Sequence, residues 1–119
     1  MLILRTMKEF LLVFRRDSHT EGLQPTAEQM NRNLQHWRDW FFALAAEGKL
    51  ARPVQGWDAE GRVIRKNMTV TVGCYADGDE SMRGMIVIRA ASYEHAVAIA
   101  QRAPILELGG TVEIRMAVY

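Results

Sequence analysis

A capped amphipathic helix, predicted between residues 26 and 48, is the feature that most constrains the fold. Pro25 precedes Thr26, whose hydroxyl can accept a hydrogen bond from a free backbone amide, and Gln29 completes a capping box. Gly48 stands where a left-handed C-terminal cap is needed. Between these ends an apolar stripe repeats at spacings of four and three residues: Met30, Leu34, Trp37, Phe41 and Leu44, with Trp40 at its edge. One face of this helix must therefore cover another apolar surface, and both tryptophans are expected to pack in the core.

Strand-like runs flank this helix and a second, shorter one. The apolar run at 9–16 is too short to bury itself as a helix, and 84–90 is the clearest strand of the second half. Ser92 caps a second helix over 93–103, in which three residues are expected to face one way: Tyr93, Val97 and Ala100. The remaining predicted pieces are short extended segments around a hairpin turn at 58–61, an extended run at 67–75 and a final strand at 111–119.

The order of these elements predicts an α+β, ferredoxin-like βαββαβ fold. In that arrangement two helices lie on one face of an antiparallel sheet, and the other face is left bare. A chain of 119 residues is close to the commonest size of one domain, so we expect a single domain over residues 1–119. Met7 is an alternative start, which would make residues 1–6 an N-terminal extension.

Alternation along the strands assigns their side chains to two faces. An entirely apolar set is expected under the helices: Phe10, Leu12, Phe14, Ile86, Ile88, Val112, Ile114, Met116 and Val118. The opposite face mixes apolar residues with charged residues near the strand ends: Leu11, Val13, Met85, Val87 and Ala117 with Arg15, Arg89, Glu113 and Arg115. A broad apolar patch is rarely left in water, so the bare face predicts a homodimer that pairs through the sheet.

Composition argues against several classes of partner. Lys and Arg number 15 against 14 Asp and Glu, so no strong overall field would collect nucleic acid or an anionic membrane. Charged residues interrupt the apolar N-terminus, which is unlike an export signal, and no stretch is long enough to span a bilayer. A single cysteine cannot form an internal disulfide, so the expected location is the cytoplasm.

Several stretches together resemble the YCII-related family, specifically its DGPF-type branch. They are "MKEFLLVFRRD", "QPTAEQM", "WRDWF", "VTVGCYAD", "GMIVIRAASYEHAVAIA" and "APILELGGTVEIR", which span Met7 to about Ala117. The resemblance implies a ferredoxin-like domain that pairs as a dimeric α/β barrel. It implies little about activity: most such proteins are uncharacterised, some resemble isomerases or lyases that use a His and Asp pair, and others occur with extracytoplasmic-function sigma factors.

This chain departs from the family signature at its centre. Where the signature reads DGPF the sequence reads "VGCY", so Val72 replaces the acid, Cys74 the proline and Tyr75 the phenylalanine. No counterpart of the family's catalytic His can be placed, since Ile105 stands between Pro104 and Leu106. Whether the protein is an enzyme therefore stays open.

The loop after "VGCY" invites metal or thiol chemistry. Asp77, Asp79 and Glu80 lack the longer, spaced ligand run of a calcium loop, and a solvated turn is the expected alternative. Cys74 has neutral or acidic neighbours, which do not lower a thiol pKa, so we expect a packed, unreactive residue. No two of the three histidines have a metal-binding spacing: His19, His36 and His95. We expect neither a metal nor a cofactor.

The candidate ligand-binding residues are Arg15, Arg89, Glu113, Arg115, Tyr75 and Trp57. Three guanidinium groups near one sheet face can bind a carboxylate or phosphate through paired hydrogen bonds, with Trp57 covering the mouth of a cavity. The alternative is ion pairing with Glu9 and Glu113. Two functions follow: a dimeric protein that binds a small anionic metabolite or acts on it weakly as an enzyme, or a protein-interaction module linked to a sigma factor.

Overall fold

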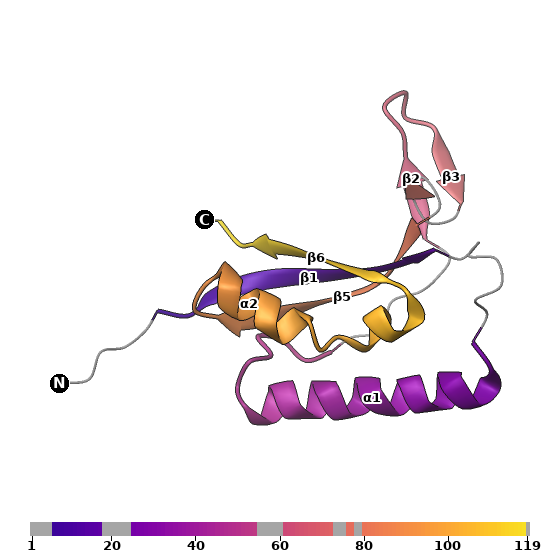
Figure 1. Ribbon diagram of the computed structural model, residues 1–119. Helices are drawn as coiled ribbons and strands as arrows, with labels where there is room; N and C mark the ends of the chain where they lie inside the picture. The colour runs from indigo at the N-terminus through magenta and orange to yellow at the C-terminus, as the bar shows by residue number, and fades with distance from the viewer. Residues whose placement is uncertain (1–5, 18–24, 55–60, 73–75, 78–79, 119) are drawn as a thin grey trace.

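Figure 1 shows the computed structural model, which describes residues 6–17, 25–54, 61–72, 76–77 and 80–118. The predicted α+β class, with two helices and an antiparallel sheet, is confirmed. In chain order the elements are β1 (Lys8–Asp17), α1 (Ala27–Ala46), β2 (Arg62–Ile64), β3 (Val70–Val72), β4 (Ala76–Asp77), β5 (Glu80–Ala90), α2 (Tyr93–Ala100), the 3₁₀ helix η1 (Pro104–Leu108) and β6 (Thr111–Met116).

Strand β1 lies inside the main sheet, whose order is β4-β5-β1-β6. It pairs antiparallel with β5 on one side and β6 on the other, so that Leu12 lies opposite both Ile86 and Ile114. The chain leaves β1 through α1 and returns from β5 to β6 through α2. This arrangement is compatible with a ferredoxin-like fold.

One hydrophobic core joins the sheet to both helices. Phe10, Leu12 and Ile88 are fully buried, and they cluster with side chains from α1 and α2. The predicted inner face is thus confirmed in β1 and β5, and its β6 members are partly buried against the same core. Val118 was wrongly included, because it lies beyond the end of β6 and is 85% exposed.

Helix α1 has the predicted ends, and most of its predicted apolar stripe packs in the core: Leu44 is buried, and Trp37 and Phe41 lie against it. Thr26 and Gln29 form the capping box. Leu34, however, is 50% exposed, whereas Asn33 and Trp40 are 3% and 8% exposed. Asn33 can be buried because its Nδ2 donates to the Pro104 carbonyl at 2.9 Å. Trp40 therefore belongs to the core rather than to the edge of the stripe.

Helix α2 begins at the predicted cap, since His95 N–H donates to Ser92 Oγ at 3.2 Å. Its buried face is made by Ala96, Ile99 and Ala100. Of the three residues expected to face one way, Ala100 is buried, whereas Tyr93 and Val97 are substantially exposed. Small alanine side chains let the helix approach the sheet closely, which places the larger residues at its flanks.

The predicted hairpin forms one segment later than expected. Strands β2 and β3 pair with each other, with Val63 opposite Thr71, so the turn lies between residues 64 and 70. Residues 58–60 of the expected turn lie outside the described part of the chain. The segment expected to precede that turn instead meets the main sheet, because Leu50 forms a bridge with Ile88. Strand β2 therefore pairs with the segment that follows it, and residues 70–72 are all β-branched, which favours an extended strand.

The open face, meaning the sheet face opposite the helices, carries the predicted apolar residues. Leu11, Met85 and Val87 are half-buried and Val13 is 7% exposed, whereas Ala117 is exposed. Among the described residues, neither α1 nor α2 is long and apolar enough to cross a membrane.

The close packing of α2 against the sheet predicts how larger side chains change the free energy of unfolding. Ala96→Leu should lower the free energy of unfolding by about 1–3 kcal/mol, because Ala96 is fully buried and added methylenes overpack the contact with the sheet. Val97→Leu, one residue along and exposed, should stay within about 0.5 kcal/mol of the unmodified protein in urea denaturation. Equal effects of the two changes would contradict the assigned buried face.

Candidate functional site

Three predicted site residues meet on the open face. Glu113 and Arg115 lie two apart on β6 and so project to the same side, and Arg15 on β1 faces them. Arg15 Nη1 donates to Glu113 Oε1, and Arg115 Nη1 donates to Glu113 Oε2 at 3.0 Å. We call this set the arginine cluster. Arg15 and Arg115 therefore already share the carboxylate of Glu113.

The charge of Glu113 follows from these contacts. The hydrogen bond from Arg15, followed by that from Arg115, holds the pKa of the Glu113 carboxyl below its usual value. The carboxylate therefore stays ionised and links β1 to β6. The half-exposed setting means that solvent screens much of this interaction.

Arg89, another predicted site residue, does not join the arginine cluster. Arg89 lies opposite Glu9, at the far end of β1, and donates to the carbonyls of Leu50 and Ala51 at 3.1 and 3.3 Å. It therefore fastens the segment after α1 to the edge of β5. Trp57 and Tyr75 lie outside the described residues.

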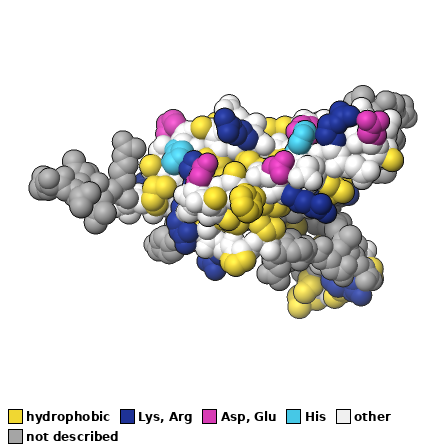
Figure 2. Space-filling view, turned by 90° about the horizontal axis from the view of Figure 1, so that it is seen from below, with side chains coloured by type: hydrophobic (Ala, Val, Ile, Leu, Met, Phe, Trp, Pro, Cys, Tyr) yellow, Lys and Arg dark blue, Asp and Glu magenta, His cyan; other side chains and the backbone are white. Residues whose placement is uncertain are grey.

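A cleft of about 400 Å³ opens on the helix side of the molecule, between the C-terminal half of α1 and α2. Figure 2 views the molecule from this side and shows hydrophobic side chains at its centre with charged and His side chains around them. Trp40, Leu44 and Ile99 supply apolar lining. The polar lining consists of Glu47, Lys49, His95 and Arg102.

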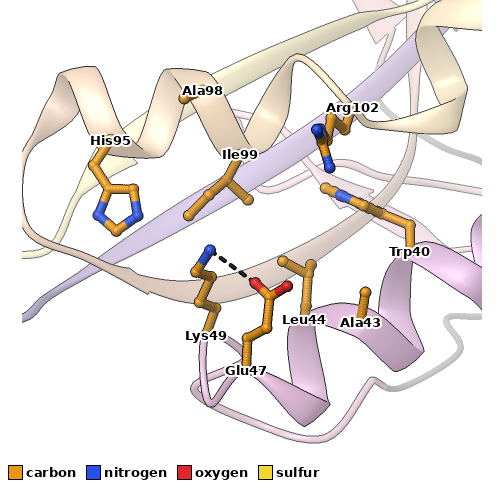
Figure 3. Close-up of a pocket in the computed structure, with 9 residues that line it drawn as sticks. All are labelled: Trp40, Ala43, Leu44, Glu47, Lys49, His95, Ala98, Ile99 and Arg102. Carbon is orange, nitrogen blue, oxygen red and sulfur yellow. Dashed lines mark ion pairs between the residues drawn. The ribbon is translucent and has the colours of Figure 1, made fainter.

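The end of α1 builds the first wall of the cleft. Gly48 has φ +69°, and its N–H donates to the Ala45 carbonyl at 3.1 Å, while Lys49 N–H donates to Leu44 at 2.9 Å. These two bonds are a Schellman cap, which confirms the predicted role of Gly48. The turn brings Lys49 Nζ to 2.8 Å from Glu47 Oε2, as Figure 3 shows.

Helix α2 and the turn after it build the second wall. His95, Ile99 and Arg102 follow one another at spacings of four and three residues, so they line the same side. The Ala91 N–H donates to His95 Nδ1 at 3.0 Å. A neutral His95 therefore carries its proton on Nε2, and the ring lies at one end of the cleft (Figure 3).

The charges of the cleft do not cancel. The hydrogen bond from Lys49, and then its charge, hold the pKa of the Glu47 carboxyl below its usual value. Glu47 and Lys49 therefore neutralise each other. Within the described ranges, the guanidinium of Arg102 has no hydrogen-bond or ion-pair partner, and its charge contributes to the lowered pKa of the Glu47 carboxyl. One positive charge is left to attract an anion.

A second polar cluster lies where α1 meets η1. His36 Nδ1 is 2.7 Å from Glu107 Oε1, and Asn33 Nδ2 donates to Glu107 Oε2 at 2.9 Å. Sequence reasoning missed this contact, because η1 was not predicted. The cluster ties η1 to α1.

Sequence reasoning also missed the cleft. The only local signal was the spacing of His95, Ile99 and Arg102, and this spacing is equally typical of a solvent-exposed helix face. No group of three or more His, Cys, Asp or Glu residues that could hold a metal occurs within the described ranges. Cys74 and Asp79 in the loop singled out from the sequence lie outside those ranges.

The lowered pKa of Glu113 predicts a pH dependence. A carboxylate with a depressed folded pKa contributes stability above its unfolded pKa of about 4.3, and loses it as pH falls through the folded value. Glu113→Gln should therefore lower the melting temperature modestly near about pH 6 and have no effect near about pH 3. Thermal unfolding followed by circular dichroism checks this. A loss that is the same at every pH would show that the ion pairs are not its cause.

Comparison with known proteins does not assign the chain to a family. No family model matches the chain, and no curated protein matches it.

Proposed function

We propose that the protein binds a small organic anion in the cleft between α1 and α2. The observation that carries this proposal is the guanidinium of Arg102, which has no acceptor among the described residues and borders a 400 Å³ cleft with an apolar lining. An arginine in such a place can hold a carboxylate or phosphate through paired, charge-assisted hydrogen bonds. Trp40, Leu44 and Ile99 then cover the apolar part of the ligand.

The cleft is a better candidate than the arginine cluster predicted from the sequence. Arg15 and Arg115 share the carboxylate of Glu113. An anionic ligand there would have to displace this carboxylate, which belongs to the same chain. The sequence proposal of an anionic metabolite is thus kept, and its site moves from the open face to the helix side.

The resemblance to the YCII-related family supports a further part of the proposal, a homodimer of dimeric α/β-barrel type built on a ferredoxin-like βαββαβ fold. The half-buried Leu11, Met85 and Val87 on the open face supply the apolar surface that such pairing needs. The single cysteine supports a location in the cytoplasm.

A second candidate function, a protein-interaction module, is favoured by the β2–β3 hairpin. Its apolar side chains are largely exposed: Ile64, Met68, Val70 and Val72. An isolated two-stranded hairpin is marginally stable alone, so this surface gains from a partner. The resemblance connects such a role with sigma factors.

The dimer proposal predicts that Val87→Arg dissociates the protein. Val87 is half-buried on the open face, and an unpaired charge in an apolar interface is strongly unfavourable. Val97→Arg, on the exposed side of α2, is the matched control and should leave the dimer intact. Sedimentation velocity at micromolar concentration is the measurement. A monomer for the unmodified protein would remove the dimer from the proposal.

The cleft proposal predicts that octanoate binds and that Arg102→Met weakens its binding at least about tenfold. A hydrogen bond to a charged group contributes roughly 1.5–3 kcal/mol, and about 1.4 kcal/mol corresponds to tenfold in affinity. Arg38→Met, an exposed arginine of α1 outside the cleft, is the control and should bind like the unmodified protein.

Titration followed by NMR reads out weak binding directly. If Arg102→Met and Arg38→Met bind octanoate equally, the cleft is not the anion site. If no carboxylate or phosphate binds the unmodified protein, the interaction module becomes the better candidate.

A further inference from the structure

We infer that the cleft takes an elongated, two-ended organic anion: an anionic group at Arg102, an apolar middle, and a hydrogen-bond acceptor at the His95 end. This inference rests on the proposed anion site and adds the shape and chemistry of the ligand. It follows from where the polar groups stand along the cleft.

The two polar ends are separated by most of α2 and the turn that follows it. His95 lies on α2, and Arg102 lies two residues beyond its end, in a turn where the Arg102 N–H donates to the Ile99 carbonyl at 3.2 Å. Seven residues correspond to roughly 10 Å at a helical rise of about 1.5 Å per residue. Figure 3 shows them at opposite ends of the cleft. One carboxylate or phosphate group cannot contact both, so a ligand that uses both must be extended.

The middle of the cleft is apolar. Ile99 lies between the two ends on α2, and Leu44 faces it from α1 (Figure 3). Both residues belong to the buried core and are held in place by it. A ligand with methylene groups or a ring in its middle buries apolar surface there, at about 25 cal/mol per Å².

The far end offers donors. Because the Ala91 N–H occupies Nδ1, neutral His95 presents Nε2–H, and Lys49 lines the same part of the cleft with its ammonium group. Glu47, the acidic group of the lining, is bound by Lys49. A ligand end that accepts a hydrogen bond from His95 Nε2–H therefore fits.

Suberate and octanoate form a matched probe pair. They have chains of equal length and share the carboxylate for Arg102, but suberate alone carries an acceptor at its other end. Succinate carries two carboxylates that are too close together to reach both ends. The ranking of these three ligands therefore separates ligand length from total charge.

Calorimetric titration of the unmodified protein should show suberate binding about tenfold more tightly than octanoate, as expected for a charge-assisted hydrogen bond, and more tightly than succinate. His95→Asn retains an acceptor for the Ala91 amide but removes the Nε2 donor, and should reduce the preference to about threefold or less. In ¹⁵N spectra of the histidine side chains, suberate should shift the Nε2 resonance of His95 and octanoate should not.

Equal affinity for suberate and octanoate in the unmodified protein would overturn the two-ended ligand and leave the anion site standing. Tighter binding of succinate than of suberate would also overturn it, because charge rather than length would then decide. Failure of all three ligands to bind would overturn the anion site itself. These comparisons use the unmodified protein, so they hold even if His95→Asn does not fold.

Discussion

Strand β1 is the element on which the rest of the structure depends. It is hydrogen-bonded on both sides, to β5 and β6, and its inward residues Phe10 and Leu12 are completely buried. Both helices pack on this surface. Helix α1 docks through an aromatic contact, in which the ring centroids of Phe14 and Trp37 are 5.0 Å apart, and α2 docks through alanines. Edge-to-face aromatic contacts add stability beyond buried area alone.

The cleft is a consequence of this docking. Trp40 and Leu44 lie at the edge between the two helices, so that part of the core surface stays accessible there. The Schellman cap and the bridge between Leu50 and Ile88 fix the chain after α1 against the sheet. The donors around the cleft therefore stand on a rigid framework, which reduces the entropy lost when a ligand binds.

The parts of the fold that depend on local signals could be predicted from the sequence. The caps at Thr26, Gly48 and Ser92 are correct because each uses hydrogen bonds within a few residues. On α1 the burial of Asn33 was missed, because this polar residue finds its hydrogen-bond partners more than 70 positions away. The hairpin was misplaced for a different reason: β2 has a possible partner on each side in the sequence, and it pairs with the more β-branched one.

The candidate site shows the same limit. Alternation correctly put Arg15, Glu113 and Arg115 on one sheet face, but the register of β1 decided that Arg89 lies at the opposite end, beside Glu9. The cleft exists only because two helices and the turn after α1 lie in a particular arrangement. No short sequence motif encodes such an arrangement. His95 and Arg102 line a cleft only once α2 is placed against α1.

The most direct test of the account is a map of backbone amide shifts when suberate is added to ¹⁵N-labelled protein. We expect the largest shifts around Lys49, His95 and Arg102, and none around the arginine cluster. Shifts centred on Arg15, Glu113 and Arg115 would contradict the account and return the anion site to the open face.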